Sequence, residues 1–248
     1  MVVGASSGLG RCIGIGLAQR GANVAMLARR VDRLERAVVE GGPNTFAIEC
    51  DVTDEDSCRS AIEAAAAKLG GIDALVYTPG IGPLARIESI DADTWRRTFD
   101  TNVTGAALTT AAAVPHLADA AGRAVYLSSV SASLTQPWPG LAAYIVSKAA
   151  LDKLVEAWRI EHPGIGFTRL IVGDCGGGEG EAQSGFTEGW DPDLAVEMAT
   201  IWMERKLLSG CLMDVEDLIG VVDSILHAGP TVALPSVTAA PRPVDSPT

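Results

Sequence analysis

The chain of 248 residues alternates between short apolar runs and longer segments of mixed polarity. The short runs are rich in Val, Ile, Leu and Ala, which predicts strands that are buried on both faces. In the longer segments apolar residues recur every three or four positions, which predicts amphipathic helices. The predicted strands are residues 23–28, 45–50, 72–77, 124–127 and 167–172, and the predicted helices are residues 31–40, 54–69, 91–121, 141–161 and 192–208.

This alternation predicts a parallel sheet, because parallel neighbours are joined by a crossover connection, which is usually a helix. Crossover helices then cover both faces of the sheet. The expected fold class is therefore α/β, with a doubly wound parallel sheet flanked by helices on both faces. We place it in a single domain over residues 1–234, because no linker and no internal repeat divides the chain.

Three stretches lie outside this pattern. Only residues 1–3 precede the first glycine, whereas a strand usually has ~5–6 residues, so we expect the natural chain to carry a few more N-terminal residues. Residues 173–190 are rich in Gly and Glu and open a variable region of about 173–210, which we expect to be a loop followed by a helix. Residues 235–248 contain four prolines, which predicts a disordered tail.

Charge and composition narrow the class of partner. The net charge is −12 and the sequence pI is near 4.6, which argues against nucleic acid or an anionic membrane surface, because both attract clustered Lys and Arg. No apolar run reaches the ~18 residues of a spanning helix, and the N-terminus lacks the pattern of a signal peptide. The five cysteines lack Cys-x-x-Cys spacing and the three histidines do not cluster. We therefore expect a cytoplasmic protein with reduced thiols and no metal site.

A glycine-rich turn follows the first apolar residues. Gly4, Gly8 and Gly10 have the spacing G-x-x-x-G-x-G, and a helical apolar pattern begins directly after them. Glycines allow a sharp turn and a close approach to a pyrophosphate, and the helix N-terminus offers N–H groups and a partial positive charge. The alternative is an ordinary turn between a strand and a helix. Its position after the first strand favours a dinucleotide site.

Tyr144 and Lys148 are four positions apart in a predicted helix, so they share one helix face. A free phenol titrates near pH ~10, and a positive charge beside it favours the phenolate. A phenol tuned in this way can exchange a proton with a carbonyl or an alcohol. The alternative is that the two residues only form a pair on the protein surface, because this spacing occurs by chance in many helices. The glycine turn, Asp51, Gly80 and Ser129 also lie at or beyond the carboxyl ends of predicted strands, so we expect one common site.

Several motifs in this order resemble the short-chain dehydrogenase/reductase family. The matching residues are 4–10 (its cofactor loop), Asp51-Val52 (its adenine contact), 100–105 (its helix motif with an active-site asparagine, here Asn102) and Tyr144-x-x-x-Lys148 (its catalytic helix). The resemblance spans roughly Val2 to Val172. It implies a Rossmann-like fold and an oxidoreductase that transfers a hydride between a nicotinamide cofactor and a carbonyl or secondary alcohol.

The resemblance also implies roles for single residues. Tyr144 would act as general acid or base, and Lys148 would lower its pKa and bind the nicotinamide ribose. Asn102 would support a water chain to Lys148, and a serine would hold the substrate oxygen. The residues that would bind the cofactor are Gly4, Ser6, Ser7, Gly8, Leu9, Gly10, Arg29, Arg30, Asp51, Val52 and Gly80, together with Tyr144 and Lys148.

The identity of that serine stays open between two candidates. Ser129 directly follows the predicted strand, as in the family, whereas Ser131 has the family's usual spacing to Tyr144. We prefer Ser129, because the loop between it and Tyr144 can absorb a two-residue insertion. Departures from the family pattern leave the seating of the nicotinamide and the substrate open: they are Val3 for a threonine, Tyr77-Thr78-Pro79-Gly80 for Asn-Asn-Ala-Gly, and Gly173-Asp174-Cys175-Gly176 for Pro-Gly.

The end of the second predicted strand favours NADP(H) over NAD(H). An NAD site usually has a carboxylate there, which binds the ribose and repels a 2′-phosphate, but this chain has Ala28. Arg29 and Arg30 follow, and a guanidinium binds phosphate through paired N–H donors. The alternative is that both arginines only solvate the next helix and pair with Asp32 or Glu35.

Two other functions fit the same motifs: a dinucleotide-binding regulatory protein without turnover, and a lyase or epimerase that uses the same tyrosine. An intact Tyr144 and Lys148 favour the oxidoreductase, since a binding protein needs no proton donor. We also expect a homo-oligomer, because residues 105–113 are nearly all small and the Tyr144 helix is strongly apolar. The remaining partner is a small molecule, for which Trp138, Trp190 and Trp202 would form either an apolar pocket or part of the core.

Overall fold

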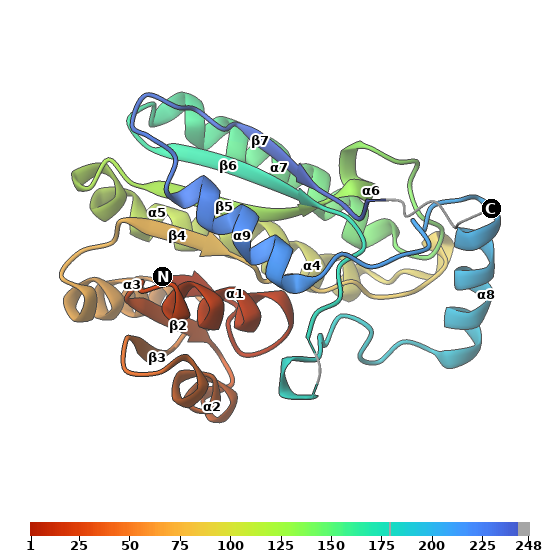
Figure 1. Ribbon diagram of the computed structural model, residues 1–248. Helices are drawn as coiled ribbons and strands as arrows, with labels where there is room; N and C mark the ends of the chain where they lie inside the picture. Colours follow the sequence, from red (N-terminus) through yellow and green to blue (C-terminus); the bar gives the residue numbers. More distant parts are fainter. Residues whose placement is uncertain (179, 243–248) are drawn as a thin grey trace.

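The computed structural model describes residues 1–178 and 180–242 and contains a seven-stranded sheet (Figure 1). The strands are β1 (Val2–Val3), β2 (Val24–Ala28), β3 (Thr45–Glu49), β4 (Ala74–Tyr77), β5 (Arg123–Ser129), β6 (Gly166–Val172) and β7 (Ser236–Ala239). Their order is β3-β2-β1-β4-β5-β6-β7, and every neighbouring pair is parallel. The strand order reverses at β1, which is where open α/β sheets bind ligands.

Helices cover both faces of this sheet, which confirms the predicted doubly wound α/β fold. They are α1 (Gly8–Gln19), α2 (Val31–Gly41), α3 (Glu55–Leu69), α4 (Ala92–Phe99), α5 (Gly105–Asp119), α6 (Val130–Ser133), α7 (Ala142–Glu161), α8 (Pro192–Glu204) and α9 (Val215–Leu226), with the 3-10 turns η1 (Ile87–Ser89) and η3 (Gly180–Ala182) and the π-helix η2 (Asp100–Thr104). None of the described helices combines the length and the apolarity needed to cross a membrane.

Alternate residues of each strand face the two helix layers. Tyr77 and Tyr126 contribute to one core with α3, α5 and α7, whereas Val76 and Val125 contribute to the other core with α1, α2 and α9. Both faces are therefore buried, as the continuous apolar runs predicted. The buried phenols are satisfied: Tyr77 Oη donates to the Thr101 carbonyl at 2.7 Å, and Tyr126 Oη lies 2.7 Å from Thr110 Oγ1.

Helix α8 lies apart from the sheet, at the right of Figure 1. It packs through Met198 and Trp202 against Leu141 and Ile145 at the start of α7. Asp191 begins it by accepting a hydrogen bond from the Leu194 amide at 2.8 Å. The result is a third apolar cluster next to the carboxyl ends of β4 and β5.

The prediction of a disordered tail from residue 235 was wrong for its first part. Ser236–Ala239 forms β7, because the exposed edge of β6 offers backbone partners: Arg169 N donates to the Pro235 carbonyl at 3.3 Å and Gly173 N to the Ala239 carbonyl at 2.8 Å. The prolines flank the strand and so remove none of its amides. Residues 243–248 of that predicted tail lie outside the described residues.

Candidate active site

A cavity of about 600 Å³ opens at the carboxyl ends of the strands. Its walls come from the turn after β1, the ends of β2, β4 and β5, the start of α7 and the loop after β6. The predicted residues among its walls are Gly4, Ser6, Ser7, Gly8, Leu9, Gly10, Arg29, Arg30, Val52, Gly80, Ser129, Tyr144 and Lys148. The strand ends therefore gather these residues in one place, whereas Asp51 and Asn102 are not among the described residues that line the cavity.

The turn between β1 and α1 requires glycine at two positions. Gly4 has a φ of +83°, which is left-handed, and a Cβ there would lie 2.6 Å from Thr78 Oγ1. A Cβ at Gly10 would lie 2.2 Å from the same oxygen and 2.4 Å from the Gly4 carbonyl. Thr78 itself donates to the Val3 carbonyl at 2.6 Å. The threonine that departs from the family pattern thus closes the turn from behind.

Arg30 reaches across to the serines of this turn. Its Nη2 donates to Ser7 Oγ at 2.7 Å and to Ser6 Oγ at 3.1 Å. Ser7 stands at the N-cap of α1, but its hydroxyl accepts from Arg30 instead of capping the helix. Partial burial and the nearby Arg33 lower the pKa of Arg30, whereas the charge of Glu188 opposes that shift. A guanidinium beside a helix N-terminus forms an anion site.

Arg29 and Asp51 form a second, more exposed group. Arg29 Nη1 lies 3.9 Å from Asp51 Oδ2, and Asp51 Oδ1 accepts from the amide and the hydroxyl of Thr53 at 3.0 and 2.8 Å. Partial burial acts to raise the pKa of Asp51, but the hydrogen bonds from Thr53 and the charge of Arg29 lower it. The two arginines therefore separate: Arg30 faces the serines, whereas Arg29 faces Asp51.

The π-helix η2 interrupts the predicted helix 91–121 and carries Asn102 at its centre. Such single-turn widenings are frequent at functional sites. Asn102 Nδ2 donates to the Ile81 carbonyl at 3.0 Å and to Ser147 Oγ at 2.8 Å, and its Oδ1 accepts from the Ile81 amide at 2.9 Å. Asn102 thus clamps the backbone that follows Gly80. A Cβ at Gly80 would lie 3.3 Å from Lys148 Nζ, so this backbone also forms the wall beside Lys148.

Tyr144 and Lys148 meet on one face of α7, as their spacing predicted. Lys148 Nζ lies 5.8 Å from the centroid of the Tyr144 ring and donates to the Leu127 carbonyl at 2.7 Å. The expected direction of the phenol's pKa shift was wrong, however. Burial raises the pKa of Tyr144 to about 12, and an interaction with the Ser129 side chain opposes the shift only in part. Desolvation of the buried phenol is the larger of these two effects.

Burial also favours the neutral form of Lys148. It lowers the pKa of Lys148 to about 8, whereas the charge of Asp152, one turn later on α7, raises it. Asp152 is itself buried, and its Oδ2 lies 3.7 Å from Arg169 Nη1. Burial raises the pKa of Asp152, and the Ser128 side chain and Arg169 oppose that shift. Our sequence analysis missed Asp152, although its spacing from Lys148 is the same as that of Tyr144.

The two candidate serines lie side by side at the end of β5. Ser129 Oγ is 2.9 Å from Ser131 Oγ and accepts from the Ser131 amide at 3.3 Å. Both line the cavity, and Ser129 is the one that interacts with Tyr144. The geometry therefore favours Ser129 as the direct partner of the phenol, with Ser131 behind it.

Phe186, from the loop after β6, is a cavity residue that sequence analysis missed. Its ring meets the Tyr144 ring edge to face, with centroids 4.9 Å apart and planes at 74°. The loop carries no apolar period, so no local pattern indicated which of its residues turns inward. Of the tryptophans we considered, Trp138 lines the cavity, whereas Trp190 and Trp202 pack behind it in the α8 cluster.

Comparison with known proteins gives matches over most of the chain. A family model described as short chain dehydrogenase matches residues 1–173. The Arabidopsis thaliana protein named 11-beta-hydroxysteroid dehydrogenase 1A is 36% identical over 197 residues, which cover 73% of this chain and 56% of that protein. The chain thus spans little more than half the length of this curated relative.

Solved structures match the whole architecture. A short-chain type dehydrogenase/reductase from Mycobacterium marinum has a TM-score of 0.82 at 27% identity, with 96% of this chain and 92% of that chain covered. An alcohol dehydrogenase from the archaeon Thermococcus sibiricus, complexed with 5-hydroxy-NADP, has a TM-score of 0.79 at 23% identity, with 100% and 97% covered. The second similarity is one of fold alone.

Proposed function

The chain belongs to the short-chain dehydrogenase family of oxidoreductases, and on that premise we propose that it transfers a hydride between NADP(H) and a carbonyl or secondary alcohol, with Tyr144 as general acid or base. The observation that carries the proposal is the convergence of Tyr144, Lys148 and Ser129 in the cavity that the glycine turn also lines. A protein that only bound a dinucleotide would need no buried proton donor beside a lysine.

The cavity fits a nicotinamide dinucleotide by two features. The backbone of the turn at Gly4 and Gly10 lines the cavity, and Arg30 with Ser6 and Ser7 forms an anion site beside it. The glycine turn would hold the pyrophosphate and Arg30 a 2′-phosphate. When bound, the cofactor supplies the hydride. Ala28 places no repelling carboxylate at the end of β2, which supports NADP(H) over NAD(H).

Tyr144 is set up as a proton donor. With a pKa of about 12 its phenol is protonated at neutral pH, so it can donate to a carbonyl oxygen as that oxygen gains charge. Ser129 would hold the same oxygen, with its hydroxyl oriented by Ser131. The phenolate left behind is unfavourable in a buried site unless a cation stabilises it. Lys148, with a pKa of about 8, is mostly an ammonium at pH 7 and supplies that charge.

The test is Tyr144→Phe, which removes the proton and keeps the ring. Turnover of NADPH with a panel of ketones and aldehydes should fall ~10²–10⁴-fold, as expected for loss of a general acid, while NADPH affinity changes only a few-fold. Tyr126→Phe is the matched control: it deletes a buried phenol hydroxyl that is hydrogen-bonded to Thr110, and the variant should keep its turnover. Wild-type protein that binds NADPH but turns over no carbonyl would support the regulatory alternative. A product formed with no net cofactor oxidation would support the lyase or epimerase.

We also propose a homo-oligomer, formed by α5 and α7. Residues 105–113 of α5 are nearly all small, which allows a second helix to approach closely. α7 exposes Val146 and Ile160, with 48% and 80% of their surface accessible. Apolar side chains at that exposure favour burial against a second copy.

A further inference from the structure

A connected series of aromatic rings leads away from Tyr144. Phe186 meets Tyr144 at 4.9 Å and Trp190 at 5.7 Å between centroids. Trp190 meets Trp202 at 6.1 Å, and Trp202 meets Trp138 at 5.4 Å. Phe186 and Trp138 line the cavity, and the other two rings support them from behind. We call these four residues, Trp138, Phe186, Trp190 and Trp202, the aromatic wall.

The polar ends of the aromatic wall are already used within the protein. Trp190 Nε1 donates to the Gly82 carbonyl at 2.8 Å, Trp202 Nε1 to the Pro139 carbonyl at 2.9 Å, and Trp138 Nε1 to Thr135 Oγ1 at 3.1 Å. The indoles therefore have no N–H left for a ligand, and what they present is ring surface. Such surface favours a partner that is itself apolar and flat.

The position of Phe186 is built into the chain by Gly82. A Cβ at Gly82 would lie 2.2 Å from Phe186 Cζ, so the ring occupies the space that any other residue would fill. The backbone of Gly82 is also the acceptor for Trp190. Gly82 thus positions two members of the aromatic wall: it leaves space for the Phe186 ring and accepts the hydrogen bond from Trp190. The position of the ring beside Tyr144 is therefore determined by the fold.

Lys148 is the charged group beside Tyr144, and the other charged side chains of the cavity are directed elsewhere. Among the described residues that line it, the charged side chains are Arg29, Arg30, Lys148, Asp174 and Glu188. Lys148 donates to the Leu127 carbonyl beside Tyr144, and Asp174 accepts from the amide and hydroxyl of Ser209 at 2.8 and 2.6 Å.

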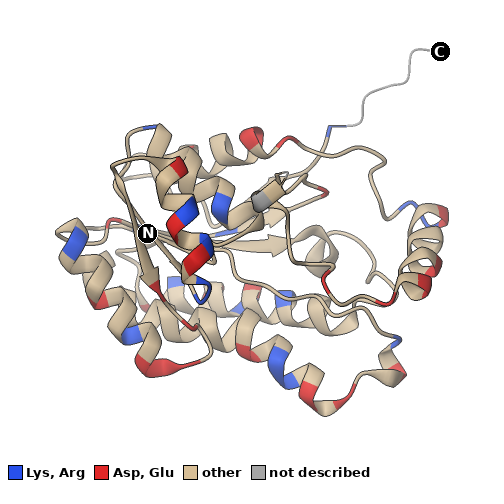
Figure 2. Ribbon diagram, turned by 90° about the horizontal axis from the view of Figure 1, so that it is seen from below, with Lys and Arg blue, Asp and Glu red and all other residues tan. Residues whose placement is uncertain are grey.

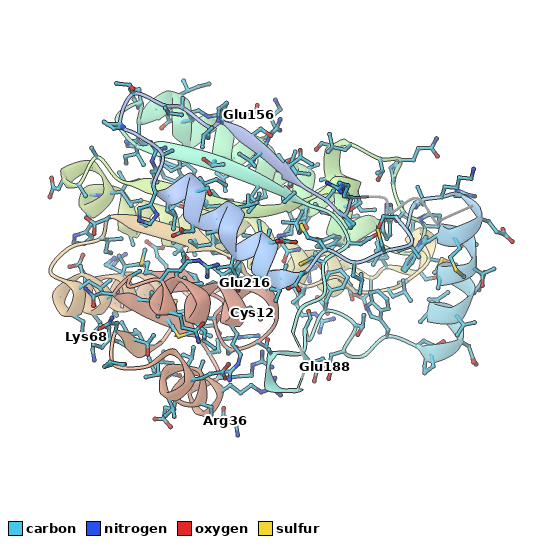
Figure 3. The ribbon with its side chains drawn as sticks, in the orientation of Figure 1. Cys12, Arg36, Lys68, Glu156, Glu188 and Glu216 are labelled. Carbon is cyan, nitrogen blue, oxygen red and sulfur yellow. The ribbon has the colours of Figure 1, made fainter. Side chains whose placement is uncertain are left out.

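The remaining charged groups lie at the opposite end. Arg29 and Arg30 lie beyond the end of β2, and Glu188, labelled in Figure 3, is close enough to Arg30 for its charge to act against the lowering of that guanidinium's pKa by burial. Phe186 contacts Tyr144, and the uncharged residues that line the cavity also include Ile81, Val130, Trp138 and Leu141.

The outer surface at this end also disfavours an anion. α8, at the right of Figure 2, carries three carboxylates, and the next cations along the chain, Arg205 and Lys206, follow its last residue. Arg86, which precedes η1, is paired with one of them, Glu197, at 2.6 Å. An anionic group placed against the aromatic wall would find no cation among its four residues.

We propose that the substrate is an uncharged ketone or aldehyde whose carbonyl is attached to a flat apolar ring. The carbonyl oxygen faces Tyr144 and Ser129, and the ring packs on Phe186 and Trp138. This inference rests on the proposed oxidoreductase function and adds the chemical class of its substrate. It excludes α-keto acids, phosphorylated sugars and other substrates that must neutralise a negative charge near the carbonyl.

The test uses two ketones of the same shape, para-methylacetophenone and para-acetylbenzoate, which differ in one carboxylate. We expect kcat/KM with NADPH to be about tenfold or more higher for the neutral ketone, since no cation offsets the buried charge. Phe186→Ala should raise KM for the neutral ketone about tenfold, and Phe186→Leu should do so less. Gly82→Val should act like Phe186→Ala, because it displaces the ring. Val196→Ala, at an exposed position of α8, is the control and should change nothing.

Binding is measured separately, by quenching of tryptophan fluorescence with each ketone in the presence of NADP⁺. Tighter binding of the neutral ketone, weakened in Phe186→Ala and Gly82→Val, supports the inference. Equal or tighter binding of para-acetylbenzoate overturns it, even if the enzyme reduces that ketone and the proposed function stands. If neither ketone is reduced and no other carbonyl of the panel is, the proposed function fails, while the binding measurement still decides whether the aromatic wall selects a neutral ring.

Discussion

Removal of Arg30 should change the choice of cofactor more than removal of Arg29. Arg30 is half-buried and already donates to Ser6 and Ser7, so it is held beside the glycine turn where a 2′-phosphate would bind. Arg29 has 67% of its side chain exposed and lies 3.9 Å from Asp51. The sequence alone favours Arg29 for the phosphate contact, because Arg29 directly follows the strand end.

The expected magnitudes follow from these environments. A hydrogen bond to a charged group contributes ~1.5–3 kcal/mol, so Arg30→Ala should weaken NADPH binding about ten- to hundredfold. Binding of NADH, which lacks the 2′-phosphate, should change no more than about threefold. An exposed charge pair contributes ~0–1 kcal/mol, so Arg29→Ala should weaken NADPH binding by about fivefold at most.

The assay is a titration of NADPH and NADH against the unmutated protein and both variants, followed by cofactor fluorescence. Arg36, labelled in Figure 3, is an exposed residue of α2 paired with Asp32, and Arg36→Ala is the control because it removes the same charge. Raising the salt concentration should reduce the NADPH preference of the unmutated protein. Equal affinity for both cofactors in the unmutated protein would refute the NADP(H) preference. An unchanged ratio in Arg30→Ala would refute the role of Arg30.

Three further predictions concern the catalytic residues and the assembly. Ser129→Ala should reduce kcat about a hundredfold or more and Ser131→Ala clearly less, and the opposite order in steady-state kinetics would exchange their roles. Asp152→Asn removes the negative charge that raises the pKa of Lys148, so that pKa falls and the alkaline limb of the pH–rate profile moves to lower pH. Glu156→Gln, which removes a half-buried carboxylate near Arg169, should leave the limb in place, and a limb that is the same in both variants would contradict the assignment. Light scattering at micromolar concentration should show a dimer or tetramer, and a monomer would disprove the assembly.

The sheet was predictable because its strands are buried on both faces and therefore consist mostly of apolar residues. Neighbouring residues such as Val76 and Tyr77 face opposite helix layers, so both must be apolar or have their polar atoms satisfied. The Tyr144–Lys148 pair and the glycine turn were predictable for a related reason. In both, the residues belong to one local element, so their spacing along the chain determines their placement in space.

Elements whose structure depends on a distant partner were not predictable in this way. Ser236–Ala239 has the composition of a loop and becomes a strand because β6 offers its edge. The same holds for Phe186, whose inward position depends on the space left by Gly82, more than a hundred residues earlier. Arg29 and Arg30 have different partners because the turn after β1 places serine hydroxyls near Arg30, whereas the end of β3 places Asp51 near Arg29. No pattern within ten residues of any of these positions contains that information.

The pKa of Tyr144 depends both on local spacing and on burial by distant parts of the chain. The direction of its shift was predicted wrongly because only the spacing is visible in the sequence. The spacing to Lys148 indicates a nearby positive charge, which favours the phenolate, but burial favours the neutral phenol and is the larger effect here. Phe186, packed on the Tyr144 ring, contributes to that burial. A phenol with an ordinary pKa of ~10 is already protonated at neutral pH, and burial strengthens that state. Phe186, which packs on the phenol ring, is also the side chain proposed to contact the substrate. A flat apolar substrate would continue the same shielding on the open side of the cavity, so its binding would keep the proton on Tyr144 until the carbonyl oxygen acquires the charge to take it.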